Sequence, residues 1–370
     1  DKELAGILNE LYIDDTVDII EEMPANVVSR ILKNTDPDTR KEINQLLNYP
    51  KDSAGSVMTT EFVYLQKDST VKEAFDRIRS IGLVKETVYT CYVTENRKLL
   101  GVVTLLEMLV SDYETKMEDI METNVISVNT HDDQETAAQM LSKYDLSALP
   151  VVDNENRIVG ILTFDDAMDV IVEENAEDIA MMSAVVPSEK TYLKTSVWIH
   201  ARNRVVWLLV LMLSAAITGA ITNHFEAQIA AIPMLVSFMP MIMGTGGNSG
   251  SQASTMIIQG MAMDEIHLRD FLKVVFKEFR IAILCSAILA TVNFARIFIT
   301  YHDLAVAAVV SITLVGTVVL AKLLGCMLPM LAKKLRIDPA LMSAPLLSTL
   351  VDSCSMLLYF TIALNMLDFN

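Results

Sequence analysis

The chain has 370 residues, a formal net charge of −18 and a mean hydropathy of +0.38, a combination of acidity and hydropathy that is unusual for one domain. Residues 1–190 hold 38 acidic and 17 basic side chains, whereas residues 191–370 hold 9 acidic and 12 basic ones. We therefore expect a soluble, acidic half that attracts cations and repels nucleic acid, followed by a membrane half.

Residues 1–52 carry apolar positions at helical spacing with acidic positions between them, which predicts an acidic helical domain. Asp36 and Pro37 have the residue types of a helix N-cap and of the first helical position. Because the chain opens with Asp1 and shows no signal peptide, we expect this domain to be truncated.

Residues 53–172 contain an internal repeat, with copies at about residues 53–115 and 116–172. Each copy predicts a strand, a helix, two strands and a second helix. Each closes on glycine, two apolar residues and threonine, at residues 101–104 and 160–163. This pattern resembles a tandem pair of CBS domains, and the resemblance implies regulation rather than catalysis.

The end of the second copy has the residue types of a nucleotide site. CBS pairs often bind adenine nucleotides such as ATP, and Thr163 would then meet a phosphate and Asp166 a ribose. The first copy has Glu107 where that aspartate would fall. Alternatively, these residues are only helix N-caps and first-turn acids.

A long helix is expected over residues 164–200, with residues 173–203 as a linker to the membrane half. Its acids lie at i, i+3 and i+4 spacing along one face, where like charges repel. A divalent cation that bridges them to another acidic surface would relieve this repulsion, and the alternative is a solvated acidic face. The acids are Asp165, Asp166, Asp169, Glu173, Glu174, Glu177 and Asp178.

Residues 204–370 predict an all-α transmembrane domain with five spans. Basic residues gather before the first span, between the second and third, and between the fourth and fifth, while residues 223–228 and 301–303 have none. The soluble half is therefore expected in the cytoplasm and the C-terminus outside the plasma membrane. The expected spans are residues 205–222, a stretch from near 229 to beyond 243, and residues 281–300, 304–331 and 340–367.

Asp352 is the only charged side chain between Ala340 and Leu367, and it lies near the centre of that stretch. An acid at mid-membrane costs about 2.5–3.5 kcal/mol on insertion scales, so such residues usually face water, a partner charge or a cation. We favour an ion site in a permeation path. The alternative is a structural acid, either paired with Arg296 or Lys322 or protonated against a neighbouring helix.

The second expected span contains a dense polar and glycine-rich segment at residues 240–255. We interpret it as a pore-lining break in the helix, whose carbonyls and Asn248 meet a hydrated ion. The alternative is a seam of small residues between packed helices.

Together these features resemble the MgtE family of magnesium channels over essentially the whole chain. The resemblance rests on residues 246–252, which include Gly247, Asn248 and Gln252, and on residues 338–352, which end in Asp352. It implies a homodimer in a lipid bilayer, with a pore on the two-fold axis where Asp352 selects Mg²⁺. Gly247, Asn248 and Gln252 would lie at this pore.

The resemblance also implies that the linker acts as a plug helix, which closes the pore when Mg²⁺ fills acidic cytoplasmic interfaces. This chain departs from many relatives at Ala344, where they carry a polar residue, and at Ser251, where they often carry Asn. The implied regulatory Mg²⁺ positions are Asp133, Glu135, Asp145, Asp166, Asp169, Glu173, Glu177 and Asp178.

The chemistry of Mg²⁺ suits this interpretation, because the ion prefers oxygen ligands and sheds its waters reluctantly. No cysteine or histidine motif accompanies Asp352, which weighs against softer metals. The main alternative function is a carrier that couples Mg²⁺ to Na⁺ or H⁺. An enzyme is not expected, because no nucleophile–base pair, metal-ligand motif or phosphate loop is visible. A sensor without transport is not favoured either, because it would not need Asp352 or the polar second span.

Overall fold

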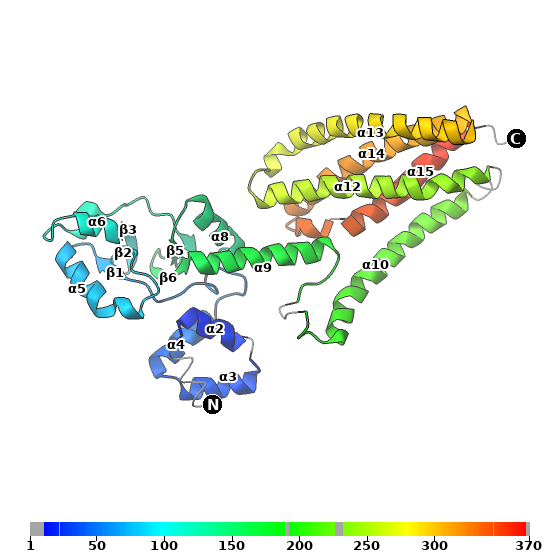
Figure 1. Ribbon diagram of the computed structural model, residues 1–370. Coiled ribbons are helices and arrows are strands. Elements are labelled where there is room, and N and C mark those ends of the chain that lie inside the picture. Colours follow the sequence, from blue (N-terminus) through cyan, green and yellow to red (C-terminus); the bar gives the residue numbers. More distant parts are fainter. Residues whose placement is uncertain (1–10, 22, 189–191, 226–231, 343, 368–370) are drawn as a thin grey trace. The chain divides into compact units, whose positions relative to one another are not determined.

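The computed structural model describes residues 11–21, 23–188, 192–225, 232–342 and 344–367 (Figure 1). The chain divides into two compact units, Asp1–Glu174 and Asn175–Asn370. The first ten residues of the expected helical domain lie outside the described residues, and so does the expected start of the second span near residue 229.

Three short helices confirm the helical character of the N-terminal region: α2 (Ile13–Glu21), α3 (Ala25–Asn34) and α4 (Pro37–Leu46). Their apolar residues belong to a hydrophobic core that also contains residues of the second CBS repeat, such as Leu149 and Leu162. These helices therefore gain their stability by packing on the CBS pair rather than by forming a separate core. The α2 and α4 residues in this core are Ile13, Val17, Ile20, Ile43 and Leu46.

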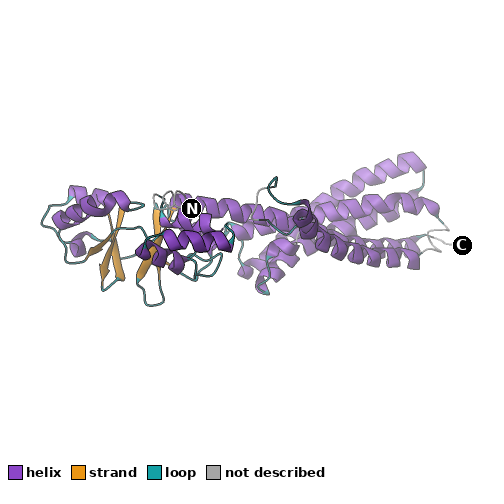
Figure 2. Cartoon of the chain, turned by 90° about the horizontal axis from the view of Figure 1, so that it is seen from below, coloured by secondary structure: helices purple, strands orange, loops and turns teal. Residues whose placement is uncertain are grey.

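The expected repeat is confirmed as two three-stranded sheets with helices (Figure 2). In each sheet the first strand pairs parallel to the second, and the second pairs antiparallel to the third. The first copy contains β1 (Tyr64–Gln66), α5 (Val71–Ile81), η1 (Gly82–Val84), β2 (Thr90–Glu95), β3 (Lys98–Thr104) and α6 (Leu105–Val110). The second contains α7 (Met117–Ile120), β4 (Val128–Asn129), α8 (Gln134–Lys143), β5 (Ala148–Val152), β6 (Ile158–Thr163) and α9 (Phe164–Met182).

The expectation of one helix over residues 164–200 is wrong in its second half. Helix α9 ends at Met182, and Ala184 adopts a left-handed conformation with φ of 54°. The Val185 N–H then donates a hydrogen bond to the Ala180 carbonyl, which would otherwise lack a partner in the last turn of the helix. Pro187 follows and cannot continue a helix.

The second unit contains five long helices: α10 (Val197–His224), α12 (Met239–Ala262), α13 (Phe271–Tyr301), α14 (Leu304–Lys334) and α15 (Ala344–Met366). Short 3₁₀ turns precede three of them: η2 (Pro233–Phe238), η3 (Leu268–Asp270) and η4 (Pro339–Met342). Four segments of the described residues are long and apolar enough to cross a membrane: Val197–His224, Leu268–Tyr301, Leu304–Lys334 and Pro339–Met366.

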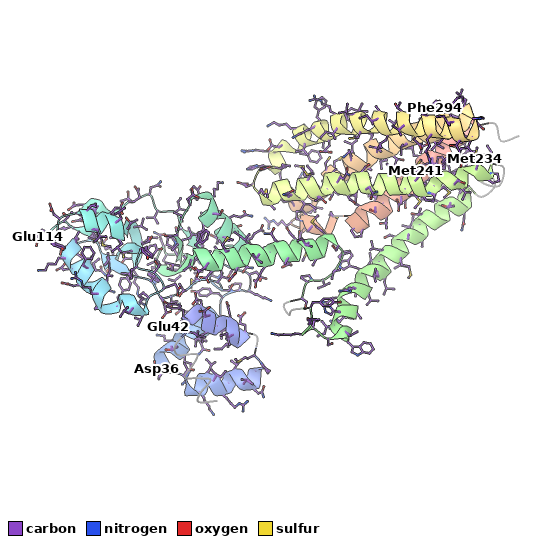
Figure 3. The ribbon with its side chains drawn as sticks, viewed as in Figure 1. Asp36, Glu42, Glu114, Met234, Met241 and Phe294 are labelled. Carbon is purple, nitrogen blue, oxygen red and sulfur yellow. The ribbon has the colours of Figure 1, made fainter. Side chains whose placement is uncertain are left out.

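The side chains labelled in Figure 3 are acidic in the first unit and apolar in the second. Acids such as Asp36 and Glu42 lie on or beside the N-terminal helices, whereas Met234, Met241 and Phe294 pack against an apolar cluster in the second unit. Helix α12 is the polar member of its helix group, since its middle turns carry glycines, hydroxyls and amides.

The expected break in this polar segment is wrong, because α12 is continuous from Met239 to Ala262. Its carbonyls therefore bond within the helix and are not free to meet an ion. The glycines instead allow close packing, as the small-residue alternative predicts. A Cβ at Gly250 would lie 3.2 Å from the Ala321 carbonyl oxygen of α14, and one at Gly246 would lie 2.7 Å from Thr317.

Candidate functional site

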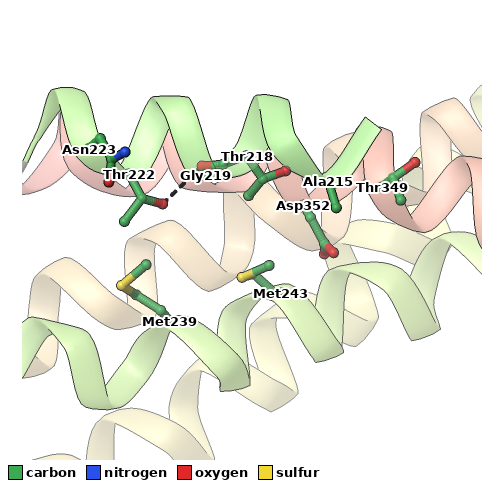
Figure 4. Close-up of a pocket in the computed structure, with 9 residues that line it drawn as sticks. All are labelled: Ala215, Thr218, Gly219, Thr222, Asn223, Met239, Met243, Thr349 and Asp352. Carbon is green, nitrogen blue, oxygen red and sulfur yellow. Dashed lines mark hydrogen bonds between the residues drawn. The ribbon is translucent and has the colours of Figure 1, made fainter. Parts of the chain in front are cut away.

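Asp352 opens onto a groove of about 360 Å³ between α10, α12 and α15 (Figure 4). It stands in the third turn of α15, and its side chain is half-buried. Most of the groove's exposed surface is apolar: the wall from α12 consists of two methionines, and three of the five α10 residues are polar. The other lining residues are Ala215, Thr218, Gly219, Thr222, Asn223, Met239, Met243 and Thr349.

Hydrogen bonds hold α10 against α15 beside this acid. The hydroxyls of Thr218 and Ser353 lie 2.7 Å apart, and Ser353 follows Asp352 directly. The Thr222 hydroxyl donates to the Thr218 carbonyl at 3.0 Å, within α10 (Figure 4). The bond between Thr218 and Ser353 keeps the Thr218 side chain beside Asp352 on the wall of the groove.

The structural alternative, an ion pair with Arg296 or Lys322, is not observed in the described part of the chain. The Arg296 guanidinium donates instead to the Asn293 amide oxygen at 3.1 Å. Lys322 is buried on α14 with 6% of its surface exposed, and no ion pair joins it to Asp352. Asp352 therefore faces the groove without a basic partner among these residues.

The predicted α12 residues do not line this groove. Gly247 is buried, and a Cβ there would lie 3.2 Å from the Ser348 hydroxyl of α15. Asn248 and Gln252 are exposed one turn apart on another face of α12. Sequence analysis missed Met239 and Met243, although they lie four residues apart and would therefore share one helix face.

Three predicted regulatory acids lie at the two ends of helix α8. The Asp133 carboxylate caps this helix and accepts a hydrogen bond from the Thr136 N–H at 3.2 Å. Glu135 accepts from the Gln139 side chain at 2.9 Å, and Asp145 lies exposed just beyond the helix with φ of 53°.

The remaining predicted acids lie on α9. The Thr163 hydroxyl donates to the Asp166 carboxylate, and the Asp166 N–H donates back to that hydroxyl at 3.4 Å. Both residues predicted for a nucleotide are thus engaged with each other at the start of the helix, as the capping alternative expects. Further along α9 are Asp169, Glu173, Glu177 and Asp178.

An acidic cluster that the sequence did not reveal lies between α2, the start of α9 and the residues before β2. Burial, with the nearby Asp15 and Glu61 carboxylates, raises the pKa of Asp14 to about 6. Burial, followed by the Asp14 and Asp166 charges, raises the pKa of Glu86 to about 7. Burial also raises the pKa of Asp166 to about 6, although its bond from Thr163 acts in the opposite direction.

These acids come from positions far apart in the chain, and sequence spacing gives no signal for their approach. Among the residues that the structure describes, no group of three or more His, Cys, Asp or Glu side chains is close enough to hold a metal ion. The four cysteines are free, and Cys91 and Cys326 are buried.

Comparison with known proteins adds an independent observation. Residues 239–362 match the MgtE family described as a divalent cation transporter, residues 1–52 match the MgtE intracellular N domain, and residues 54–112 and 117–173 match the CBS domain. Among solved structures, the cytosolic domain of the Mg²⁺ channel MgtE in complex with ATP is 40% identical and covers 45% of this chain and 69% of its own, with a TM-score of 0.44.

Two curated relatives match nearly the full chain. The magnesium transporter MgtE of Thermus thermophilus is 37% identical over 364 residues, which is 96% of this chain and 80% of the relative. The magnesium transporter MgtE of Bacillus subtilis is 33% identical over 361 residues, which is 96% of this chain and 79% of the relative. The chain therefore belongs to the MgtE family.

Proposed function

We propose that this protein is a Mg²⁺-selective channel for Mg²⁺ uptake across the plasma membrane, closed by Mg²⁺ in the cytoplasm. The observation that carries the proposal is Asp352, an acid without a basic partner among the described residues that faces a groove within the membrane helices. Its relatives are named magnesium transporters, which favours a transporter over an enzyme.

The few polar groups of this mostly apolar groove would act on a hydrated ion rather than on a stripped one. Mg²⁺ holds its waters tightly, so a filter acts through hydrogen bonds to those waters and through charge. Asp352 would supply the charge, and Thr218, Thr222 and Asn223 would accept hydrogen bonds from the ion's waters.

A homodimer would double the charge at the pore. Two Asp352 carboxylates near a two-fold axis would repel each other unless a divalent cation lay between them. The exposed amides of Asn248 and Gln252 lie on another face of α12, where they would line a different part of the aqueous path, and Gly247 would set the contact of α12 with α15.

Closure would come from the acidic cytoplasmic half. Without Mg²⁺, the raised pKa values of Asp14, Glu86 and Asp166 record mutual repulsion and burial that oppose packing. Mg²⁺ at such interfaces would stabilise the closed arrangement, because an ion shifts an equilibrium only by binding one state more tightly. Helix α9 would act as the plug, and Asp133, Glu135, Asp145, Asp169, Glu173, Glu177 and Asp178 would contribute to the regulatory sites.

This gating proposal is tested with the variant Asp166→Asn, Asp169→Asn, Glu177→Gln and Asp178→Asn. We expect it to conduct Mg²⁺ but to remain open at cytoplasmic Mg²⁺ concentrations that close the parent. A variant that closes at the same concentration as the parent would exclude these acids as the sensor.

ATP at the second CBS domain belongs to the same proposal. Binding would exchange the bond between Thr163 and Asp166 for bonds to a phosphate and a ribose hydroxyl.

The proposed domains are residues 1–52, 53–172, 173–203 and 204–370, with the N-terminal half in the cytoplasm and the C-terminus outside.

The ion path is tested by Mg²⁺ flux into proteoliposomes. We expect Asp352→Ala and Asp352→Asn to lose flux while they keep the elution volume of the parent. Glu278→Gln is the matched control, since it removes a buried carboxylate of α13 that lies outside the groove. Retained flux in both Asp352 variants would make this acid structural and overturn the proposal.

A further inference from the structure

Residues 192–204 form an elbow that leads into the first membrane helix. Its start is folded against α10, because the Tyr192 carbonyl lies 3.1 Å from the His200 Nε2 atom and the two rings are 4.7 Å apart. Asn203 bonds on its other side to the segment before the elbow, since the Val186 N–H donates to the Asn203 carbonyl at 3.1 Å. These contacts give the elbow a defined shape.

The elbow exposes large apolar side chains that water does not favour. Leu193 is 93% exposed, Trp198 is 86% exposed, and Tyr192 and Val197 are also mostly exposed. Tryptophan and tyrosine concentrate at membrane–water interfaces, where an apolar ring with one polar group is well solvated. The composition of this surface is therefore that of a membrane interface rather than of a water-exposed loop.

The same elbow carries three exposed cations, Lys194, Arg202 and Arg204. None of them is paired with a carboxylate among the described residues. Helix α10 contains no acid at all, so no carboxylate on this helix neutralises the positive charge of the elbow. Such a surface is complementary to an anionic one.

The position of these cations matches the headgroup layer. The uninterrupted apolar stretch of α10 begins at Val205. With a rise of about 1.5 Å per residue, Arg202 and Arg204 lie within about 5 Å of that boundary. The polar layer on each side of a bilayer is about 5–8 Å thick, and long arginine side chains reach lipid phosphates easily.

We propose that residues 192–204 form a binding surface for anionic phospholipid headgroups. Lys194, Arg202 and Arg204 pair with the lipid phosphates, while Trp198 and Leu193 insert beside the glycerol backbone. The elbow joins α9 to α10, so bound lipid also fixes the start of the first membrane helix.

The chain supplies its own reporter, since its two tryptophans are Trp198 and Trp207. The full-length Trp207→Phe variant keeps Trp198 alone, and it is reconstituted into phosphatidylcholine vesicles. Small fractions of nitroxide-labelled phosphatidylglycerol or nitroxide-labelled phosphatidylcholine are then added. We expect the anionic quencher to associate with Trp198 at least five-fold more strongly than the zwitterionic one.

Adding Lys194→Gln, Arg202→Gln and Arg204→Gln to this reporter should abolish the preference, since each removed charge contributes up to roughly five-fold to it. The control Lys277→Gln, Lys334→Gln and Arg336→Gln removes equal charge elsewhere and should keep it. Equal quenching by both lipids in the parent reporter, or a preference that survives the first set, would overturn the proposal.

Two further measurements complete the test. Inorganic phosphate added to phosphatidylcholine vesicles should leave the Trp198 emission unchanged, and a change like that caused by phosphatidylglycerol would assign the surface to free phosphate instead. Hydrogen exchange of the unaltered chain avoids any folding defect of the variants. It should show slower exchange of residues 192–204 in phosphatidylglycerol than in phosphatidylcholine, and equal exchange would contradict the proposal.

Discussion

The contact between α12 and α14 depends on two glycines and predicts the outcome of a single methyl insertion. A Cβ at Gly325 would lie 2.4 Å from the Gly250 carbonyl oxygen and 3.1 Å from the Ala253 Cβ. An ordinary contact needs about 3.4 Å, so Gly325→Ala requires the two backbones to separate by about 1 Å. Overpacking of this kind costs about 1–3 kcal/mol, because neither partner is a flexible side chain.

The matched control is Gly244→Ala on α12, where a Cβ would meet no atom within 4 Å. Alanine favours helices over glycine by up to about 1 kcal/mol, so this variant should be as stable as the parent or more so. We expect Gly325→Ala to lower the melting temperature of the purified protein by roughly 2–10 °C relative to Gly244→Ala. Equal melting of the two variants would refute the close glycine contact.

Two further predictions concern the acidic cluster and the wall of the groove. Because the folded pKa values of Asp14, Glu86 and Asp166 are raised to about 6–7, the folded state binds more protons than the unfolded chain between about pH 4 and 7, and its stability falls as pH rises through this window. After solvent screening, the loss of stability amounts to about 1 kcal/mol per group. Metal-free protein should therefore melt at a lower temperature at pH 8 than at pH 5, and Mg²⁺ should stabilise it more at pH 8. A melting temperature that does not change between pH 5 and pH 8 would contradict the acidic cluster. Thr218→Val and Ser353→Ala should each cost about 1 kcal/mol, and a double-mutant cycle of melting measurements should give a coupling of about 0.5–1 kcal/mol, whereas zero coupling would remove the bond between α10 and α15.

Much of the fold could be predicted because local patterns specify it. The CBS repeat shows its strands as short apolar runs and its helix starts as threonine followed by an acid, and Thr104 with Glu107 forms a capping box in the structure. The limits of α14 follow from Asp303, which caps it, and from the basic residues of its last turn.

The errors arose where tertiary packing outweighs local composition. Glycines near Asn248 suggested a break, but they lie in a helix because α14 and α15 pack closely against them. The linker helix ended early because Ala184 adopts a left-handed conformation, which alanine seldom does.

The candidate site could be predicted only in part. Asp352 stands out in the sequence because a lone acid in an apolar span is costly, whatever surrounds it. Met239, Met243 and the α10 hydroxyls around it are ordinary membrane residues, and only the packing of three helices brings them together. Asp14 and Glu86 are likewise unremarkable in sequence and approach Asp166 only in the folded unit.

The measurement that tests the central claim most directly is Mg²⁺ current through single proteins in a planar bilayer. A Mg²⁺ channel that passes the ion along Asp352 predicts discrete openings in Mg²⁺ alone, without a Na⁺ or H⁺ gradient, which disappear in Asp352→Asn and persist in Glu278→Gln. Mg²⁺ transport that requires a Na⁺ or H⁺ gradient and shows no discrete openings, or openings that persist in Asp352→Asn, would contradict it.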